Sequence, residues 1–256
     1  MAGWVTLLLA LLASAALMGG VLKLSERRAT FVSSVTHELR TPLTTFHLYS
    51  DMLAEGMVKE ESRQKEYLTT MRREAERLNH LVENVLSYSR VERGSARTEH
   101  QKITLQGLVD RMLPRLNERV RKDGAELEVV LTQGEEAQID TDLTAVEQIV
   151  FNLVDNACKY GLPEQGARVV CLRASNGGRV ARIEICDGGS GIDRADEKKL
   201  FRPFHKSARD AAHSKPGVGL GLALCKRLAR ELGGDLTLGD REAEGACFVL
   251  ELPAVG

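Results

Sequence analysis

The chain has 256 residues, of which 43% are hydrophobic and 28% are charged, a balance typical of globular proteins with one or two modest domains. Lys and Arg number 35 and Asp and Glu number 36, so the formal net charge is -1. Nucleic-acid-binding domains usually carry a basic excess, and the single Trp, Trp4, leaves little for base stacking. Composition therefore disfavours a nucleic-acid partner.

The N-terminal residues 4–22 form an uncharged, apolar run. As a helix this run is about 28 Å long, close to the hydrocarbon thickness of a bilayer. Three basic residues follow between positions 23 and 28, and none precedes the run, which places the C-terminal side in the cytoplasm. We predict a single transmembrane helix over residues 1–22, in the cell (inner) membrane, with the catalytic part cytoplasmic.

A cleaved signal peptide is the alternative for this segment. Residues 13–15 are small, as at a signal-peptide cleavage site. However, no basic residue precedes the apolar run, and the run continues well past these positions, so a retained span is favoured.

A long helix is predicted from about residue 22 to 54, with His37 on the face opposite its apolar stripe. Gly56 marks a turn, and a second amphipathic helix follows over roughly 61–93. The stripe of the first helix is formed by Phe31, Val35, Leu39, Pro42, Phe46, Tyr49 and Leu53. We expect an antiparallel hairpin that pairs with a second copy into a dimeric four-helix bundle. Packing of one hairpin on the following domain is the alternative.

Beyond a polar linker at 95–102, the pattern changes to alternating helices and strands, which favours an α/β sandwich in an α+β fold. The expected segments are helices at 105–122, 142–160 and 218–232, an irregular stretch at 193–216, and strands near 125–131, 137–140, 167–174, 179–186, 235–238 and 246–252.

The five cysteines do not form a CxxC pair, and most lie in apolar runs. Buried, reduced thiols of a cytosolic domain are the best interpretation. Without metal-ligand spacing, a zinc site is disfavoured.

His37 is followed directly by Glu38, so a nucleophilic imidazole would have a proton acceptor beside it. An exposed histidine on a helix is by itself most often only a surface residue. Pro42, a few residues later, removes a backbone hydrogen bond and is expected to bend the helix.

Two glycine clusters and one polar helix face suggest phosphate binding. Asp187 to Gly191 follow an apolar strand, and residues 217–222 open a helix, where backbone N–H groups favour an anion. Asn152, Asn156 and Lys159 share one helix face and suit Mg²⁺ and phosphate, although a solvated helix face is the ordinary interpretation. A Rossmann domain is disfavoured because no first βαβ unit precedes the glycines.

In combination and in order, these segments resemble the conserved boxes of histidine kinases. The stretch 37–43 (HELRTPL) is similar to the H box, 152–160 (NLVDNACKY) to the N box, and 187–191 (DGGSG) to the first glycine box. The stretch 201–204 (FRPF) resembles the F box and 217–222 (GVGLGL) the second glycine box. The resemblance covers about residues 26–252.

The resemblance implies a membrane-bound sensor histidine kinase that uses ATP and Mg²⁺, forms a homodimer and passes its phosphoryl group to a response regulator. Its expected parts are a transmembrane helix (1–22), a dimerisation and phosphotransfer hairpin (23–98) and an ATP-binding domain of the histidine-kinase and gyrase type (99–256). The implied site residues are His37 as phosphoacceptor, Glu38 as proton acceptor, Thr41 for phosphatase activity, Lys206 at the γ-phosphate, Asn152 and Asn156 for Mg²⁺, and Lys159, Tyr160, Asp187, Gly189, Gly191, Phe204, Gly217, Gly219 and Gly221 for nucleotide. Many relatives have an Arg where this chain has Lys206, and Lys lacks the bidentate fork of a guanidinium.

Two other function classes are weighed against this one. An ATPase of the gyrase or chaperone type predicts neither an H box nor a dimerising hairpin. A non-catalytic membrane scaffold predicts broken ATP motifs, whereas the motifs here are intact.

Overall fold

The computed structural model describes residues 2–92, 99–132, 138–163, 166–205, 219–239 and 245–254. The chain divides into two compact units, one running from the N-terminus to Val82 and the other beginning at Glu83. Each unit is described by itself.

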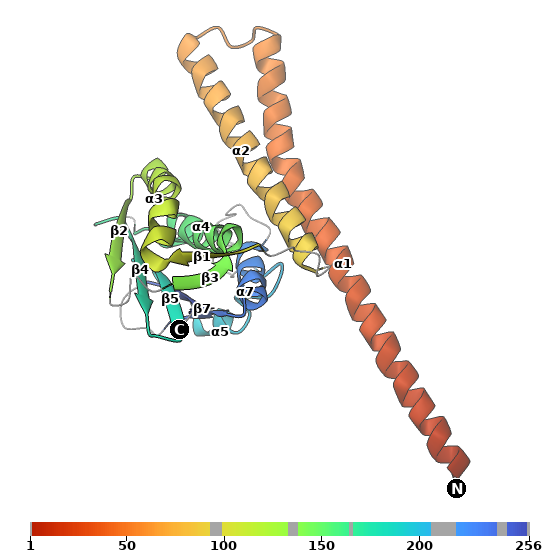
Figure 1. Ribbon diagram of the computed structural model, residues 1–256. Helices are drawn as coiled ribbons and strands as arrows, with labels where there is room; N and C mark the ends of the chain where they lie inside the picture. The colour runs from red at the N-terminus through yellow and green to blue at the C-terminus, as the bar shows by residue number, and fades with distance from the viewer. Residues whose placement is uncertain are drawn as a thin grey trace. The chain divides into compact units, whose positions relative to one another are not determined.

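Two long helices form the first unit, α1 (Ala2–Ala54) and most of α2 (Glu61–Glu92). They are joined by a short turn in which Gly56 has a φ of 65°, a conformation that glycine adopts without strain. The rings of Tyr49 and Tyr67 stack with centroids 4.3 Å apart, which fixes the pairing of α1 with α2. The predicted hairpin is therefore present (Figure 1).

Helix α1 joins the two helices predicted over 1–22 and about 22–54 into one and continues without interruption through Pro42, which is buried. Pro42, where a bend was predicted, therefore does not interrupt the helix. Across the described residues, no helix combines the length and apolar character needed to cross a membrane. The predicted span over residues 1–22 is thus not confirmed, and the side chains of residues 4–10 within it lie outside the described part of the chain.

The predicted apolar stripe of α1 is only partly covered within one chain. Of its members, Pro42 is buried, Phe46 is 39% exposed, and the others are half-buried. Leu43, Leu48 and Leu68 of the same unit are each more than half exposed. A single hairpin therefore leaves apolar surface in contact with water.

The second unit is an α+β fold built on a mixed sheet. Its helices are α3 (Leu105–Lys122), α4 (Leu143–Tyr160), the short α5 (Arg194–Glu197) and α7 (Gly221–Glu231). Its strands are β1 (His100–Thr104), β2 (Glu126–Leu131), β3 (Gln138–Asp142), β4 (Val169–Asn176), β5 (Val180–Asp187), β6 (Asp235–Leu238) and β7 (Cys247–Pro253).

Five of these strands form one sheet in the order β2-β4-β5-β7-β6, with β2 parallel to β4 and the remaining pairs antiparallel. Strands β1 and β3 form a separate antiparallel pair. Helices α3, α4 and α7 lie on one side of the large sheet (Figure 1). Alternate strand residues such as Leu172, Ile185 and Leu250 are fully buried beneath them, so the core lies between the helices and the sheet.

Among the described residues, the elements that were not predicted from the sequence are strand β1 and the short helix α5. Strand β1 begins at His100, inside the predicted linker, and pairs with β3 from His100 opposite Asp142 to Thr104 opposite Gln138. Only its last two residues are even half-buried, so it lacks the apolar alternation that marks a strand. The stretch predicted to be irregular contains α5, and its later part, from residue 206, lies outside the described residues.

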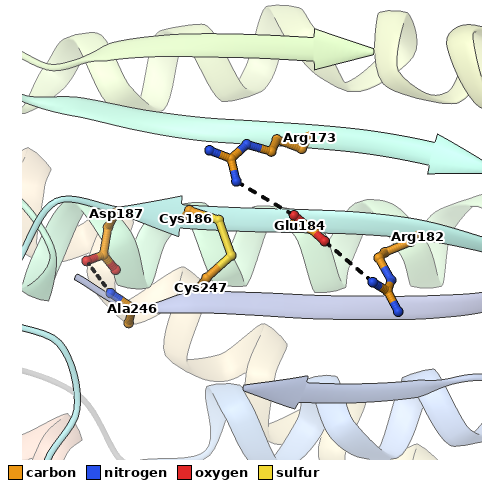
Figure 2. Close-up of a disulfide and its surroundings, with 7 residues drawn as sticks. All are labelled: Arg173, Arg182, Glu184, Cys186, Asp187, Ala246 and Cys247. Carbon is orange, nitrogen blue, oxygen red and sulfur yellow. Dashed lines mark hydrogen bonds and ion pairs between the residues drawn. A yellow bond between two sulfur atoms is a disulfide. The ribbon is translucent and has the colours of Figure 1, made fainter. Parts of the chain in front are cut away.

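The cysteine prediction was partly wrong. Cys158 and Cys225 are free and buried and Cys171 is free and half-buried, but Cys186 and Cys247 form a disulfide (Figure 2). These two residues are direct partners across β5 and β7, and their Cα atoms are 4.0 Å apart. A sequence separation of 61 residues concealed this proximity, which only strand register brings about.

Candidate functional site

His37 lies on α1 with its side chain exposed, as predicted. The adjacent Glu38 is only 15% exposed, and its Oε2 accepts a hydrogen bond from Nη2 of Arg77 on α2 at 3.0 Å. Arg77 also lies 3.4 Å from Glu74. An ion pair between the two helices therefore fixes the carboxylate of Glu38, the residue that follows His37 in the sequence. Sequence reasoning missed Arg77, since no local pattern links it to Glu38.

Thr41 is exposed one helical turn after His37. Its backbone carbonyl accepts a hydrogen bond from Oγ1 of Thr45 at 3.3 Å, and the carbonyl of Arg40 accepts one from Thr44 at 2.9 Å. These two threonines bond back to the helix backbone. The Thr41 side chain thus stands in water on the part of α1 that presents His37.

Helix α4 carries the predicted amide face. Asp142 caps its N-terminus by accepting from the backbone N–H of Ala145 at 3.1 Å. Asn152 and Asn156 are half-buried toward the other end of the helix, whereas Lys159 and Tyr160 are exposed on its last turn. The helix therefore presents two amides, an ammonium and an aromatic ring within about two turns.

Asp155 of the same helix lies between two cations. Its Oδ1 is 2.8 Å from Nε of Arg119, and its Oδ2 is 2.5 Å from Nζ of Lys159. Burial alone would raise the pKa of Asp155, but Lys159 and Arg119 hold it below the ordinary carboxyl value. Likewise, burial opposes the charge of Arg119, yet hydrogen bonds to Asp123 and Asp155 raise its pKa. Arg119 was not singled out from the sequence, and Asp155, although it lies within the predicted N box, was given no role.

Asp187 ends strand β5, and Figure 2 shows it beside Ala246. Its Oδ1 accepts hydrogen bonds from the backbone N–H of Gly189 at 3.0 Å and of Ala246 at 3.1 Å. Burial raises the pKa of this carboxyl above its ordinary value, and the two backbone donors offset that effect only in part. The backbone therefore fixes one oxygen of this carboxylate.

Three glycines leave the space that Asp187 occupies. A Cβ on Gly161 would lie 2.1 Å from Cγ of Asp187, and one on Gly245 would lie 1.8 Å from its backbone oxygen. A Cβ on Gly189 would lie 2.7 Å from Cα of Gly161. Any side chain at these positions would displace the carboxylate or its neighbours. Gly189 was predicted from its motif, but Gly161 and Gly245 lie outside the recognised boxes.

Three further glycines of the predicted motifs, Gly191, Gly219 and Gly221, lie within the described residues. Gly191 has a φ of 70°, and a Cβ there would lie 2.8 Å from the carbonyl oxygen of Gly245. Gly219 also has a φ of 70° and accepts a hydrogen bond from the backbone N–H of Phe204 at 2.9 Å. Gly221 is the first residue of α7, so this helix N-terminus presents N–H groups suited to an anion.

Phe204 has a φ of 65°, a conformation that non-glycine residues adopt rarely and at a cost. Its backbone bond to Gly219 joins the two ends of the intervening segment. The predicted residues Lys206 and Gly217 belong to that segment and lie outside the described residues.

The chemistry of these groups fits a magnesium nucleotide. Amide oxygens, which Asn152 and Asn156 supply, are hard ligands of the kind that Mg²⁺ prefers. Lys159 adds a positive charge on the same helix.

The fold and site together define an α+β unit with a candidate nucleotide site, in a chain that also carries a helical hairpin with an exposed histidine. Family models agree with each part. Residues 27–94 match the His Kinase A (phospho-acceptor) domain, and residues 141–256 match the histidine kinase-, DNA gyrase B-, and HSP90-like ATPase.

Individual relatives point the same way. The sensor protein SrrB of Staphylococcus aureus (strain N315) is 27% identical over 230 residues, which cover 90% of this chain and 39% of SrrB. The crystal structure of full-length ShkA in complex with AMPPNP is similar with a TM-score of 0.61 and 28% identity, covering 87% of this chain and 45% of ShkA. Histidine kinase ThkA in complex with response regulator protein TrrA shares the fold, with a TM-score of 0.66 and 23% identity over 88% of this chain and 61% of ThkA.

This chain therefore belongs to the sensor histidine kinases. It spans about two fifths of the length of the curated relatives it matches.

Proposed function

We propose that this chain is the kinase core of a two-component sensor, which transfers the γ-phosphoryl group of ATP to His37 and then to an aspartate of a response regulator. The observation that supports this most directly is the exposed His37 beside Glu38, a carboxylate held by Arg77. The phospho-acceptor model matches this same segment.

In the proposed reaction, one imidazole nitrogen of His37 attacks the γ-phosphorus. A nitrogen–phosphorus bond forms as the bond from phosphorus to the β,γ-bridging oxygen breaks, and ADP leaves with that oxygen. Glu38 takes the proton from the other ring nitrogen, which keeps the imidazole nucleophilic. The ion pair with Arg77 restricts the conformations of this carboxylate.

The nucleotide is held by the second unit in this proposal. Asp187 accepts a hydrogen bond from the adenine amino group, Tyr160 packs on the adenine ring, and Lys159 contacts a phosphate. Asn156, helped by Asn152, holds Mg²⁺, which neutralises phosphate charge when bound. The backbone around Gly189, Gly191, Gly217, Gly219 and Gly221 approaches the nucleotide closely. Phe204 flanks the same site, and Lys206 provides a cation for the γ-phosphate.

The proposal also includes a homodimer, a membrane anchor and a response-regulator partner. A homodimer through the hairpin covers the exposed Leu43, Leu48 and Leu68. The uncharged run at 4–22 anchors the chain in a membrane with the kinase on the cytoplasmic side. The phosphotransfer hairpin comprises residues 23–98 and the ATP-binding domain residues 99–256. A response-regulator partner is supported by ThkA, which forms a complex with TrrA.

The full chain, purified in detergent and incubated with γ-labelled ATP and Mg²⁺, tests this proposal. We expect label that is lost in acid and retained in base, as for a phosphohistidine. His37→Gln removes the label but leaves ATP binding unchanged. His47→Gln is the matched control, because His47 is also an exposed histidine of α1.

Equal labelling of the His37→Gln chain would refute His37 as the phosphoacceptor. Failure of the unaltered chain to bind ATP at all would refute the kinase function itself. Membrane anchoring is tested separately, by whether high-salt or alkaline washes release the full chain from membranes.

A further inference from the structure

Three cysteines lie in a row across neighbouring strands of the large sheet. Cys171 of β4 is the register partner of Cys186 of β5, and Cys186 is the register partner of Cys247 of β7. Directly opposed residues of antiparallel strands point to the same face of the sheet. The central residue, Cys186, is therefore adjacent to a cysteine on either side. It is bonded to Cys247, while Cys171 is a free thiol.

The row lies on the face of the sheet away from the helices. The residues that alternate with these cysteines, Leu172, Ile185 and Phe248, are buried in the core. The three cysteines themselves are only half-buried, unlike the buried Cys158 of α4 and Cys225 of α7. Small thiols in solution therefore have access to the row, which they lack for the two core cysteines.

The disulfide is one residue away from the carboxylate of the nucleotide site. Cys186 precedes Asp187, and Cys247 follows Ala246 (Figure 2). Asp187 and Ala246 are joined by two hydrogen bonds, from the backbone N–H of Asp187 to the Ala246 oxygen at 2.9 Å and from the Ala246 N–H to Oδ1 of Asp187 at 3.1 Å. A covalent link between Cys186 and Cys247 thus fixes the two backbone segments that aim the Asp187 carboxylate.

We propose that Cys171, Cys186 and Cys247 form a thiol–disulfide exchange site, and that its state sets the affinity of the chain for ATP. The Cys186–Cys247 bond holds Asp187 ready for adenine, and its opening loosens that support. Preorganising a binding group lowers the cost of binding, so the closed form binds nucleotide more tightly. This inference depends on the nucleotide site proposed above.

The substrates of this site are low-molecular-weight thiols and disulfides. In closing, one of the two thiolates attacks such a disulfide, forms a mixed disulfide and releases a small thiolate. The second cysteine then attacks the mixed disulfide and releases the other small thiolate, so the two electrons removed from the cysteines reduce the small disulfide. Opening is the reverse, with two small thiols supplying the electrons.

Cys171 adds a route that consumes no external reagent. Its thiolate attacks the sulfur of Cys186, which forms a Cys171–Cys186 bond and releases Cys247 as a thiolate. The number of disulfides does not change. Burial raises the pKa of the Cys171 thiol, so the thiolate that starts this route is a minor form at neutral pH and the rearrangement should become faster as pH rises.

A metal site at the same place is disfavoured by the charges around it. Glu184, Cys186 and Cys247 have potential ligand atoms within 4.8 Å of one another. However, Arg173 and Arg182 each lie 3.9 Å from a carboxylate oxygen of Glu184 (Figure 2). Two guanidinium groups on the only carboxylate of this cluster repel a cation, whereas thiol–disulfide exchange requires none.

The test measures disulfide state and ATP affinity on the same samples. The full chain is equilibrated in buffers of oxidised and reduced glutathione at several ratios, and the thiols are then trapped. Mass spectrometry locates the disulfide, and a fluorescent ATP analogue reports the dissociation constant. We expect the disulfide to open as the reduced fraction rises, and the dissociation constant to increase about fivefold or more in step with it.

Variants separate exchange from a general effect of thiols. Cys186→Ala and Cys247→Ala should each bind nucleotide with the weaker affinity in every buffer. Cys225→Ala is the control and should keep the full redox response, because burial raises the pKa of Cys225 to about 12 and keeps it unreactive. Cys171→Ala should lack the Cys171–Cys186 isomer among the trapped species, which the unaltered chain should show.

Two results would overturn the inference. One is an ATP affinity that stays constant while mass spectrometry shows the Cys186–Cys247 bond both closed and open, a result that leaves the proposed kinase function standing. The other is a complete absence of nucleotide binding in every redox state, which removes the proposed nucleotide site and this inference with it.

Discussion

Arg119 of α3 and Asp155 of α4 are joined by a hydrogen-bonded ion pair, with 2.8 Å between Nε and Oδ1. The second oxygen of Asp155 binds Lys159, one turn further along α4. Arg119 therefore connects the packing of α3 on α4 to the ammonium that we place at the ATP phosphates. Its own side chain is only 16% exposed, which keeps this connection largely out of water.

Replacing Asp155 with Asn should destabilise the protein in a pH-dependent manner. Because the pKa of Asp155 is lowered in the folded state, its contribution is present above the unfolded carboxyl pKa and is lost as pH falls through the folded value. We expect a loss of about 1.5–3 kcal/mol in the free energy of unfolding at pH 7. Denaturant titrations at pH 7 and at acid pH measure the difference. Asp110→Asn, an exposed change on α3, is the control, and a loss independent of pH would contradict the ion-pair explanation.

Asp187→Asn should separate nucleotide binding from stability. Asparagine keeps the oxygen that accepts from Gly189 and Ala246 but presents an amide where adenine needs an acceptor. We expect ATP affinity to fall by about ten- to hundredfold, which corresponds to about 1.5–3 kcal/mol.

The same variant should keep its stability at neutral pH. Because the folded pKa of Asp187 is raised, the stability linked to its protonation is present at low pH and is lost as pH rises through that value. The melting temperature at pH 7 should therefore not decrease. Calorimetry on the variant measures both quantities, and a lower melting temperature with unchanged affinity would assign Asp187 to the fold alone.

Gly161→Ala should displace the carboxylate of Asp187 and so weaken ATP binding. The added methyl group would lie 2.1 Å from Cγ of Asp187, so the side chain must move. We expect a loss of ATP affinity of about tenfold or more, with a smaller loss of stability. Gly177→Ala is the matched control, because its nearest contact would be an ordinary 3.7 Å. Fluorescent-nucleotide titration of both variants decides whether Gly161 keeps the space for Asp187.

Thr41→Ala should distinguish two activities at the exposed face of α1. We expect autophosphorylation within about threefold of the unaltered chain, but dephosphorylation of the regulator slower by about tenfold, or about 1.4 kcal/mol of barrier. A hydroxyl near His37 can position water against a phospho-aspartate without taking part in ATP chemistry. Thr69→Ala on α2 is the control, and parallel loss of both rates would mean that Thr41 only supports the helix at Pro42.

Sequence periodicity was sufficient for most of the fold. The helices predicted at 105–122 and 142–160 agree with α3 and α4 almost residue for residue, and β6 was placed correctly. These elements bury one regular face, so their period is visible in the sequence. The exposed position of His37 was confirmed for the same reason.

Features that depend on contacts between distant segments were missed. Arg77 of α2 binds Glu38 of α1. Gly245, just before β7, lies against Asp187 at the end of the neighbouring strand β5. Cys186 and Cys247 are brought together by the register of the same two strands. None of these pairs has a local spacing from which to infer it. The role of Lys206 and the domain boundary at residue 98 remain predictions, because both positions lie outside the described residues.

The three glycines packed around Asp187 have a consequence for inhibition. Gly161, Gly189 and Gly245 belong to three separate stretches of chain, and each leaves no space for an added methyl group. A drug that competes with ATP by hydrogen bonding to Asp187 would therefore touch a surface with very few tolerated substitutions. Resistance would have to arise from residues farther out, where the natural ligand and the drug differ in shape.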